Sequence, residues 1–279
     1  MKQCVIICSA ILFYFLCSSL INAKQNAFSE FDLNNPVVYP LPDDLDEISG
    51  IVYHPQSKTV FAVDDEEGNL FQFSLTKKIT LQKWHVGKAR DYEGIALTDN
   101  RFYLLASDGS ITSFPFSFPV KDVVAFDSPV KKKNEFESLY FAGDRNQLMM
   151  ICKECRDDKK GETTVFAFDL QKKAFDENAG TKIKLDVIEK KTGIKIGSFK
   201  PSAATKHPSN GNVYILSSIN HVLVVMDAEL KRVLQVYPLD KKIFGQPEGI
   251  AFTPEGHLLI SNEAVGKAPS NVLFFQHKK

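Results

Sequence analysis

The chain has 279 residues, of which 44% are hydrophobic and 24% are charged, a composition typical of globular proteins and unlike that of disordered or fibrous chains. Lys and Arg together number 34, as do Asp and Glu, so no overall positive charge points to nucleic acid as a partner. The length fits one large domain or two smaller ones.

The first 23 residues contain a single charge and a long apolar stretch, which is typical of an export signal. The apolar stretch is shorter than the ~20 residues that a membrane span needs. We expect cleavage after Ala23, which leaves a single domain, residues 24–279, in the periplasm or outside the cell. Two alternatives stay open: a lipid on Cys17 or an uncleaved signal would each anchor the chain to a membrane.

A four-residue motif recurs five times along the rest of the chain. It reads ISGI at 48–51, YEGI at 92–95, FESL at 136–139, PSAA at 201–204 and PEGI at 247–250. The second positions of successive motifs are 44, 44, 65 and 46 residues apart. A period near 45 residues is typical of propeller blades or of repeats built from paired helices.

The content of each repeat favours strands over helices. Short β-branched and aromatic segments are separated by turn residues, and no segment has an apolar helical face three turns long. In the first repeat the predicted strands are 51–53, 59–63, 70–73 and 79–84. The sequence therefore predicts an all-β propeller with four-stranded blades.

The last repeat contains only three predicted strands, the last of them at 271–275. The segment 36–40 precedes the first motif just as 79–84 precedes the second. We expect this N-terminal strand to pair with the last blade, because ring closure of this kind removes open sheet edges.

The long interval between the third and fourth motifs could hide a sixth blade. It contains predicted strands at 139–141, 148–151, 163–168 and 182–187, which make one blade. The remaining residues, 188–199, predict a short helix or a loop insertion. The sequence therefore favours five blades over six.

The inner strand of each blade lines the channel of a propeller, so the second motif positions are expected to meet there. These positions are Glu93, Glu137 and Glu248, together with Ser49 and Ser202. Three converging carboxylates repel one another unless a cation lies between them. Because all these ligands are oxygens, we expect Ca²⁺ or another hard divalent ion, and the loose geometry of the ring favours Ca²⁺ over Mg²⁺.

A second layer of candidate ligands recurs at the ends of the second strands. Its members are Asp64, Asp108, Glu154, Ser218 and Glu263. Of these, Asp64 and Glu263 are the carboxylates that we expect to bind the metal ion. The alternative interpretation is that they stabilise turns, as Asp and Asn often do at strand ends.

Removal of the signal leaves Cys152 and Cys155 as the cysteines of the mature chain. Their C-x-x-C spacing precedes a charged loop and not a helix, which favours a local disulfide or two free thiols. A thiol redox centre or half of a zinc site is the alternative.

Other candidate motifs give weaker signals. The sequence has no Gly-rich phosphate loop, no G-x-S-x-G motif and no H-E-x-x-H motif. His54, His207 and His257 fall at turns after the inner strands, where we expect surface positions. The lysines at 131–133 are expected to be solvated loop charges.

The chain resembles the SdiA-regulated, YjiK-like family over about residues 37–275. The resemblance rests on EISG at 47–50, DYEGI at 91–95, FESL at 136–139, KPSA at 200–203, YILSS at 214–218, QPEGI at 246–250 and ISNE at 260–263. It implies a five-bladed propeller distantly similar to NHL-repeat propellers, with a calcium site and no established activity. Glu93, Glu137 and Glu248 match acidic positions of the family, and Asn262 and Glu263 match its closing Asn-Glu pair.

Two functions are compatible with such a site. The first is an exported, monomeric calcium-binding module or scaffold, whose partner is an unidentified protein or small molecule. The alternative is a metal-dependent hydrolase of the lactonase or phosphoesterase kind, in which the channel ion polarises a substrate oxygen and activates water. The sequence contains many carboxylates but no distinctive general base, which favours the first interpretation.

Overall fold

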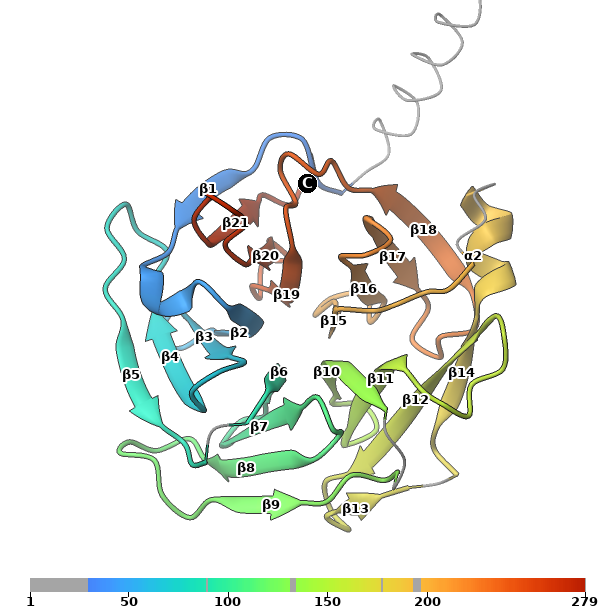
Figure 1. Cartoon of the computed structure of the whole chain (residues 1–279), viewed down its shortest axis with the longest axis horizontal. Coiled ribbons are helices and arrows are strands. Elements are labelled where there is room, and N and C mark those ends of the chain that lie inside the picture. Colours follow the sequence, from blue (N-terminus) through green and yellow to red (C-terminus); the bar gives the residue numbers. More distant parts are fainter. Residues whose placement is uncertain (1–29, 89, 131–133, 177, 193–196, 279) are drawn as a thin grey trace, which may run out of the picture.

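A computed structural model of the chain shows five antiparallel sheets arranged around a central axis (Figure 1). The structure describes residues 30–278 apart from 89, 131–133, 177 and 193–196. The predicted export signal, with Cys17, lies outside the described residues, as do the lysines at 131–133. In the part that is described, no helix is long and apolar enough to cross a membrane.

Blades one and two follow the predicted pattern of four strands. Blade one consists of β2 (Ile48–His54), β3 (Thr59–Asp64), β4 (Asn69–Phe73) and β5 (Gln82–His85). Blade two consists of β6 (Tyr92–Leu97), β7 (Arg101–Ala106), β8 (Ile111–Pro115) and β9 (Val124–Phe126). In both, the first strand lies innermost and carries the repeated motif (Figure 1).

The long interval between the third and fourth motifs forms one blade, blade three, and its described residues contain no sixth blade. It consists of β10 (Glu135–Ala142), β11 (Gln147–Glu154) and β12 (Glu162–Asp169), with β13 (Ala174–Phe175) and β14 (Thr181–Lys184) both paired to β12. Helix α2 (Leu185–Thr192) follows directly. The prediction of a strand up to residue 187 is therefore wrong beyond Lys184. Leu185 and Ile188 are buried at the three-residue spacing of a helical face, and this burial overrides the β-branched composition.

Blade four consists of β15 (Ala203–Lys206), β16 (Val213–Ser217), β17 (Val222–Met226) and β18 (Val233–Pro238). Blade five consists of β19 (Pro247–Phe252), β20 (Leu258–Asn262), β21 (Asn271–Phe275) and the N-terminal β1 (Val37–Pro40). In that blade Val37 pairs with Phe274 and Pro40 with Asn271. The predicted five blades and the closure of the ring by the N-terminal strand are both confirmed.

Hydrophobic side chains between neighbouring blades form the core. Phe61 of blade one and Phe102 of blade two, for example, are fully buried with their ring centroids 4.9 Å apart. Nearer the axis the inner strands pack backbone to backbone, because a Cβ atom added to Gly50 would lie 2.8 Å from the Cα atom of Gly94. The glycine of the motif thus allows adjacent inner strands to approach closely and keeps the channel narrow.

Candidate metal centre

The ring glutamates sit on β-bulges. Tyr92 lies opposite Ala106 and Gly94 opposite Leu105, so Glu93 between them has no residue opposite it. The same irregularity occurs at Glu137 in β10 and at Glu248 in β19. A bulge redirects the side chain of the extra residue, and here the redirected side chains are the carboxylates at the channel.

The structure brings the three glutamates into one electrostatic environment. Burial, followed by the charges of Glu137, Asp91 and Glu248, raises the pKa of Glu93 to about 9. Burial, followed by Glu137 and Glu263, raises the pKa of Glu248 to about 8. Glu137 and Glu248 are only 8% and 9% exposed, so water screens these charges poorly.

Glu263, at the end of β20, belongs to the same acidic group. Burial and the charges of Glu47, Asp65 and Glu137 raise its pKa to about 8. Gln246 donates a side-chain hydrogen bond to one of its oxygens. This candidate of the second layer therefore lies where a ring-bound ion could reach it.

Asp64 lies beside the ring and not in it. It lines a cavity of about 170 Å³ together with Glu67 and Lys83. The next residue, Asp65, has the charges of Glu47 and Asp91 near it, and burial together with these charges raises its pKa to about 6. The role of Asp64 as a metal ligand therefore stays a prediction, and its neighbour Asp65, just beyond the end of β3, is a further candidate.

Of the other second-layer residues, Asp108 and Ser218 lie near the ring glutamates, and Glu154 forms an ion pair outside this group. Asp108 lines a cavity of about 410 Å³ together with Glu93 and Glu137, and the Ser218 side chain is near enough to Glu248 to lower its pKa. Glu154 instead pairs with Lys200, with 2.6 Å between Nζ and Oε2.

Sequence reasoning missed Lys153. Its ammonium group donates a hydrogen bond to Glu137 and lies 4.0 Å from an oxygen of Glu135. Burial alone would lower the pKa of Lys153, but Glu137 and the neighbouring carboxylates raise it. The repeated motif does not predict that Lys153 faces the channel. A bulge in β11 adds one residue at this point and shifts the alternation of side-chain directions by one position.

The donor set fits a hard cation. Besides the carboxylates, the Ser49 hydroxyl, one Asp65 oxygen and the Asn262 amide oxygen are buried without a hydrogen-bond partner among the described residues. These are oxygen ligands of the kind that Ca²⁺ and Mg²⁺ take. Among the described residues, however, the ring carboxylates do not form a set of three with ligand atoms within 4.8 Å of one another, so binding would have to draw them inward.

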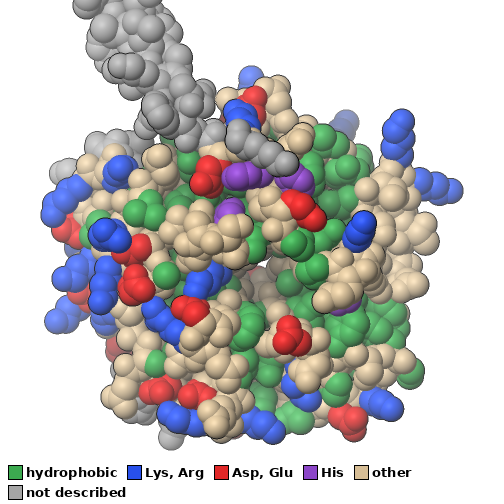
Figure 2. Space-filling model, turned by 180° about the vertical axis from the view of Figure 1, so that it is seen from behind, with side chains coloured by type: hydrophobic (Ala, Val, Ile, Leu, Met, Phe, Trp, Pro, Cys, Tyr) green, Lys and Arg blue, Asp and Glu red, His purple; other side chains and the backbone are tan. Residues whose placement is uncertain are grey.

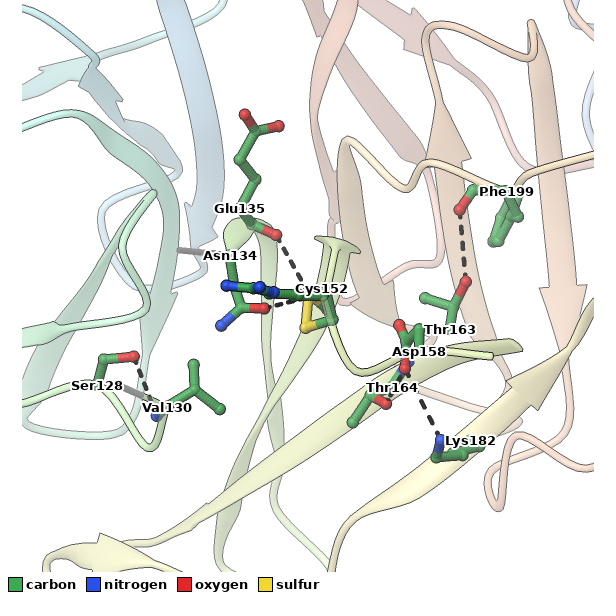
Figure 3. Close-up of a disulfide and its surroundings, with 12 residues drawn as sticks. Ser128, Val130, Asn134, Glu135, Cys152, Asp158, Thr163, Thr164, Lys182 and Phe199 are labelled. Carbon is green, nitrogen blue, oxygen red and sulfur yellow. Dashed lines mark hydrogen bonds and ion pairs between the residues drawn. A yellow bond between two sulfur atoms is a disulfide. The ribbon is translucent and has the colours of Figure 1, made fainter. Parts of the chain in front are cut away.

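Cys152 and Cys155 form a disulfide, with 5.9 Å between their Cα atoms (Figure 3). The expectation of a local disulfide is confirmed, and that of free thiols or half of a zinc site is wrong. Although both sulfurs lie near Asp158, their mutual bond removes the thiolates that a soft metal would need.

His54 and His257 are half-buried at turns, but the surface position expected for His207 is wrong. His207 is only 4% exposed, because Tyr214 and Phe252 pack against its ring. One of its ring nitrogens lies within 4.8 Å of ligand atoms of Glu30 and His277. Its Nδ1 atom accepts backbone N–H groups 3.2 and 3.4 Å away, which leaves the proton of the neutral ring on Nε2 and makes that nitrogen a donor.

The opposite end of the channel is apolar. All five inner strands contribute to a cavity of about 390 Å³, and its lining includes Tyr53, Leu97, Phe141, Lys206 and Phe252. Figure 2, which views the molecule from behind, shows hydrophobic side chains around a central hollow. The channel is therefore acidic at one mouth and mainly apolar at the other.

Three solved structures show the same fold at low sequence identity. The chain is similar to a glutaminyl cyclase from Myxococcus xanthus, with a TM-score of 0.59, 16% identity and coverage of 87% of this chain and 95% of that one. A luciferin-regenerating enzyme matches with a TM-score of 0.53, 11% identity and the same coverages of 87% and 95%. A nidogen/laminin complex matches with a TM-score of 0.50, 13% identity and coverages of 77% and 72%.

No curated protein matches the sequence. The sequence model of the family described as SdiA-regulated, in contrast, matches residues 30–266, which is most of the chain. The five-bladed structure agrees with that match. The chain is thus a β-propeller that belongs to the SdiA-regulated family.

Proposed function

We propose that the acidic mouth of the channel binds a hard divalent cation, Ca²⁺ before Mg²⁺, and that the protein is an exported binding module. The observation that carries this proposal is the set of buried carboxylates. Glu93, Glu137, Glu248 and Glu263 interact electrostatically with one another, and Lys153 supplies one positive charge to them. Buried charges of one sign are costly, and a divalent ion offsets that cost.

Glu93, Glu137 and Glu248 would hold the ion, and Glu263 of the second layer would add a fourth carboxylate. Ca²⁺ accepts more oxygens than Mg²⁺ and tolerates irregular geometry, which suits carboxylates supplied by three different blades. When bound, the ion would supply positive charge that links these blades across the axis. The inner strands position the carboxylates, and the bulges direct them toward the axis.

Two features support a role outside the cytoplasm. The apolar first 23 residues predict export, and a disulfide such as Cys152–Cys155 persists in oxidising compartments. The apolar mouth offers a surface for an unidentified small molecule or protein. A monomeric module, rigidified by its cation, would present this mouth to the partner.

A metal-dependent hydrolase is the second candidate. The cavity of about 410 Å³ that Glu93 and Glu137 line also contains Asp91 and Asp108, so a substrate could reach a ring-bound ion there. A carboxylate of that cavity that does not hold the ion, such as Asp108, could serve as the general base for an ion-bound water. The enzymes of similar fold are at most 16% identical to this chain, so that similarity adds no argument beyond the fold itself.

Thermal unfolding of residues 24–279 tests the cation site. We expect millimolar Ca²⁺ to raise the Tm of the metal-free protein by several degrees, and Mg²⁺ to raise it less, because an ion that binds only the folded state stabilises it. Glu248→Gln should abolish the shift, since it keeps the shape of the side chain and removes its charge. Glu67→Gln, which removes an exposed carboxylate paired with Lys83, is the matched control and should retain the shift.

An unchanged Tm in wild type with either ion would contradict the proposal, as would an equal shift in Glu248→Gln. A hydrolase would in addition convert lactone or phosphate-ester substrates in the presence of the ion and lose that activity in Glu248→Gln. Absence of turnover together with a Tm shift would favour the binding module.

A further inference from the structure

Blade three departs from regular pairing twice at the acidic mouth. Between β10 and β11, Glu135 pairs with Glu154 and Phe136 with Cys152, so Lys153 has no residue opposite it. Glu137, one position beyond Phe136, is likewise a bulge residue. Two neighbouring bulges therefore direct opposite charges into the same part of the channel.

The lysine and the glutamate form a close ion pair. The Nζ atom of Lys153 contacts Oε1 of Glu137, and the two side chains are only 24% and 11% exposed. The charge of Lys153 also acts on Glu93 and Glu248. An ion held by all three glutamates would need the same Glu137 oxygens that now accept the ammonium group.

The disulfide lies directly beside this lysine. β11 pairs with β12 only as far as Ile151, opposite Val165, so the end of β11 that carries Lys153 lacks ladder support on that side. The bond from Cys152 to Cys155 closes a short loop at this end of β11 (Figure 3). The Cys152 sulfur also lies 3.3 Å from the backbone oxygen of Glu135. The backbone N–H of Arg156, just after the disulfide, donates a hydrogen bond to Oδ1 of Asn134, 2.8 Å away, which ties this loop to the residue before β10.

We propose that Lys153 is a tethered internal cation that competes with the divalent ion for Glu137, and that the Cys152–Cys155 disulfide holds it in place. This inference rests on the proposed cation site and assigns its regulation. A bound ion would displace the ammonium group toward Glu135 and solvent. Breaking the disulfide would loosen the tether and favour the ion.

Calorimetric titration of Ca²⁺ into metal-free wild type and Lys153→Met tests the competition. We expect Lys153→Met to bind Ca²⁺ about tenfold more tightly, because a like charge and a competing partner are removed from a partly buried site. Its metal-free Tm should be lower than that of wild type, since Glu137 loses its partner. Lys200→Met, which removes a neighbouring charge paired with Glu154, is the control and should leave the affinity within about twofold of wild type.

Equal or weaker Ca²⁺ binding by Lys153→Met than by wild type would overturn the inference and leave the proposed cation site intact. Binding by Lys153→Met alone would support the competition between the lysine and the ion, but it would contradict Ca²⁺ binding by the wild-type protein. Failure of both proteins to bind Ca²⁺ or Mg²⁺ would overturn the cation site and the inference together. Lys153→Gln, of similar polarity, repeats the test should Lys153→Met fail to fold.

The tether is tested by replacing both cysteines with alanine in wild type and in Lys153→Met. The Cys152→Ala/Cys155→Ala pair should raise the Ca²⁺ affinity of wild type about threefold or more and leave that of Lys153→Met unchanged. Such non-additivity shows that the disulfide acts through the lysine. An equal change in Ca²⁺ affinity in wild type and in Lys153→Met, or no change in wild type, would overturn the role of the disulfide as a tether. Circular dichroism establishes that each variant is folded.

Discussion

At the scale of single residues, the acidic mouth depends on carboxylates that remain out of water without enough positive charge around them. Burial and mutual repulsion raise the pKa of Glu93 to about 9 and that of Glu248 to about 8. Lys153 pairs with Glu137 and its charge also acts on Glu93 and Glu248, but burial outweighs it and the pKa of all three glutamates stays raised. These glutamates therefore lower the free energy of unfolding at neutral pH in the absence of an ion.

This imbalance predicts the pH dependence of stability. Between the unfolded pKa near 4.5 and the raised values of about 8 to 9, the folded protein holds protons that the unfolded chain has released. The free energy of unfolding of the metal-free protein should therefore fall as pH rises from 5.5 to 8.5, by about 2 kcal/mol or more.

Urea unfolding at several pH values measures this trend, and saturating Ca²⁺ should largely remove it, because the ion then compensates the ionised carboxylates. Carboxylates with a lowered pKa, such as Asp144, titrate below this window and do not disturb the trend. Burial lowers the pKa of His54, His207 and His221 from 6.5, so these histidines add stability as pH rises through the lower part of the window and reduce the fall there. Constant or increasing stability toward pH 8.5 without metal would contradict the account of the acidic mouth.

At the scale of elements, the five inner strands bring residues from distant parts of the chain to one axis. The bulge aims the acidic side chain, and the glycine after it allows the next inner strand to approach. A Cβ atom at Gly50 would lie 2.8 Å from backbone atoms of both Gly94 and Ile95, which cannot move aside as a flexible side chain would.

Gly50→Ala should therefore lower the free energy of unfolding by about 2–4 kcal/mol, because adjacent inner strands must separate. Gly87→Ala is the matched control, since nothing lies within 4 Å of the Cβ atom it would gain. Chemical denaturation of both variants measures the difference. Similar stability of the two variants would show that the inner strands are not packed as closely as described.

The sequence predicts some of the channel residues well and misses others for local reasons. Glu93, Glu137 and Glu248 could be found because the same motif marks the same bulge in each of their blades. Lys153 could not be predicted from the sequence, because its bulge occurs in blade three only. The bulge also breaks the alternation from which the direction of a side chain is inferred.

At the scale of the whole molecule, the repeat period and strand composition are enough to predict five blades and their closure. The period gives the number of units, and three strands in the last unit require a fourth from the other end of the chain. The start of α2 at Leu185 and the burial of His207 depend on packing between distant segments, which a local pattern does not contain.

Closure of the ring also couples the five blades, because each inner strand contacts the inner strands of both neighbouring blades. An ion at the acidic mouth would thus link blades two, three and five without any change in their order. The apolar mouth, built from the other ends of the same strands, would be held in one shape as a result.

A crystal structure of residues 24–279 grown with Ca²⁺, with the ion identified by its anomalous scattering, tests the central claim most directly. We predict one ion on the channel axis, bound by oxygens of Glu93, Glu137 and Glu248, with the Lys153 ammonium group moved away from Glu137. A channel that holds only water, with Lys153 still paired to Glu137 at saturating Ca²⁺, would contradict it.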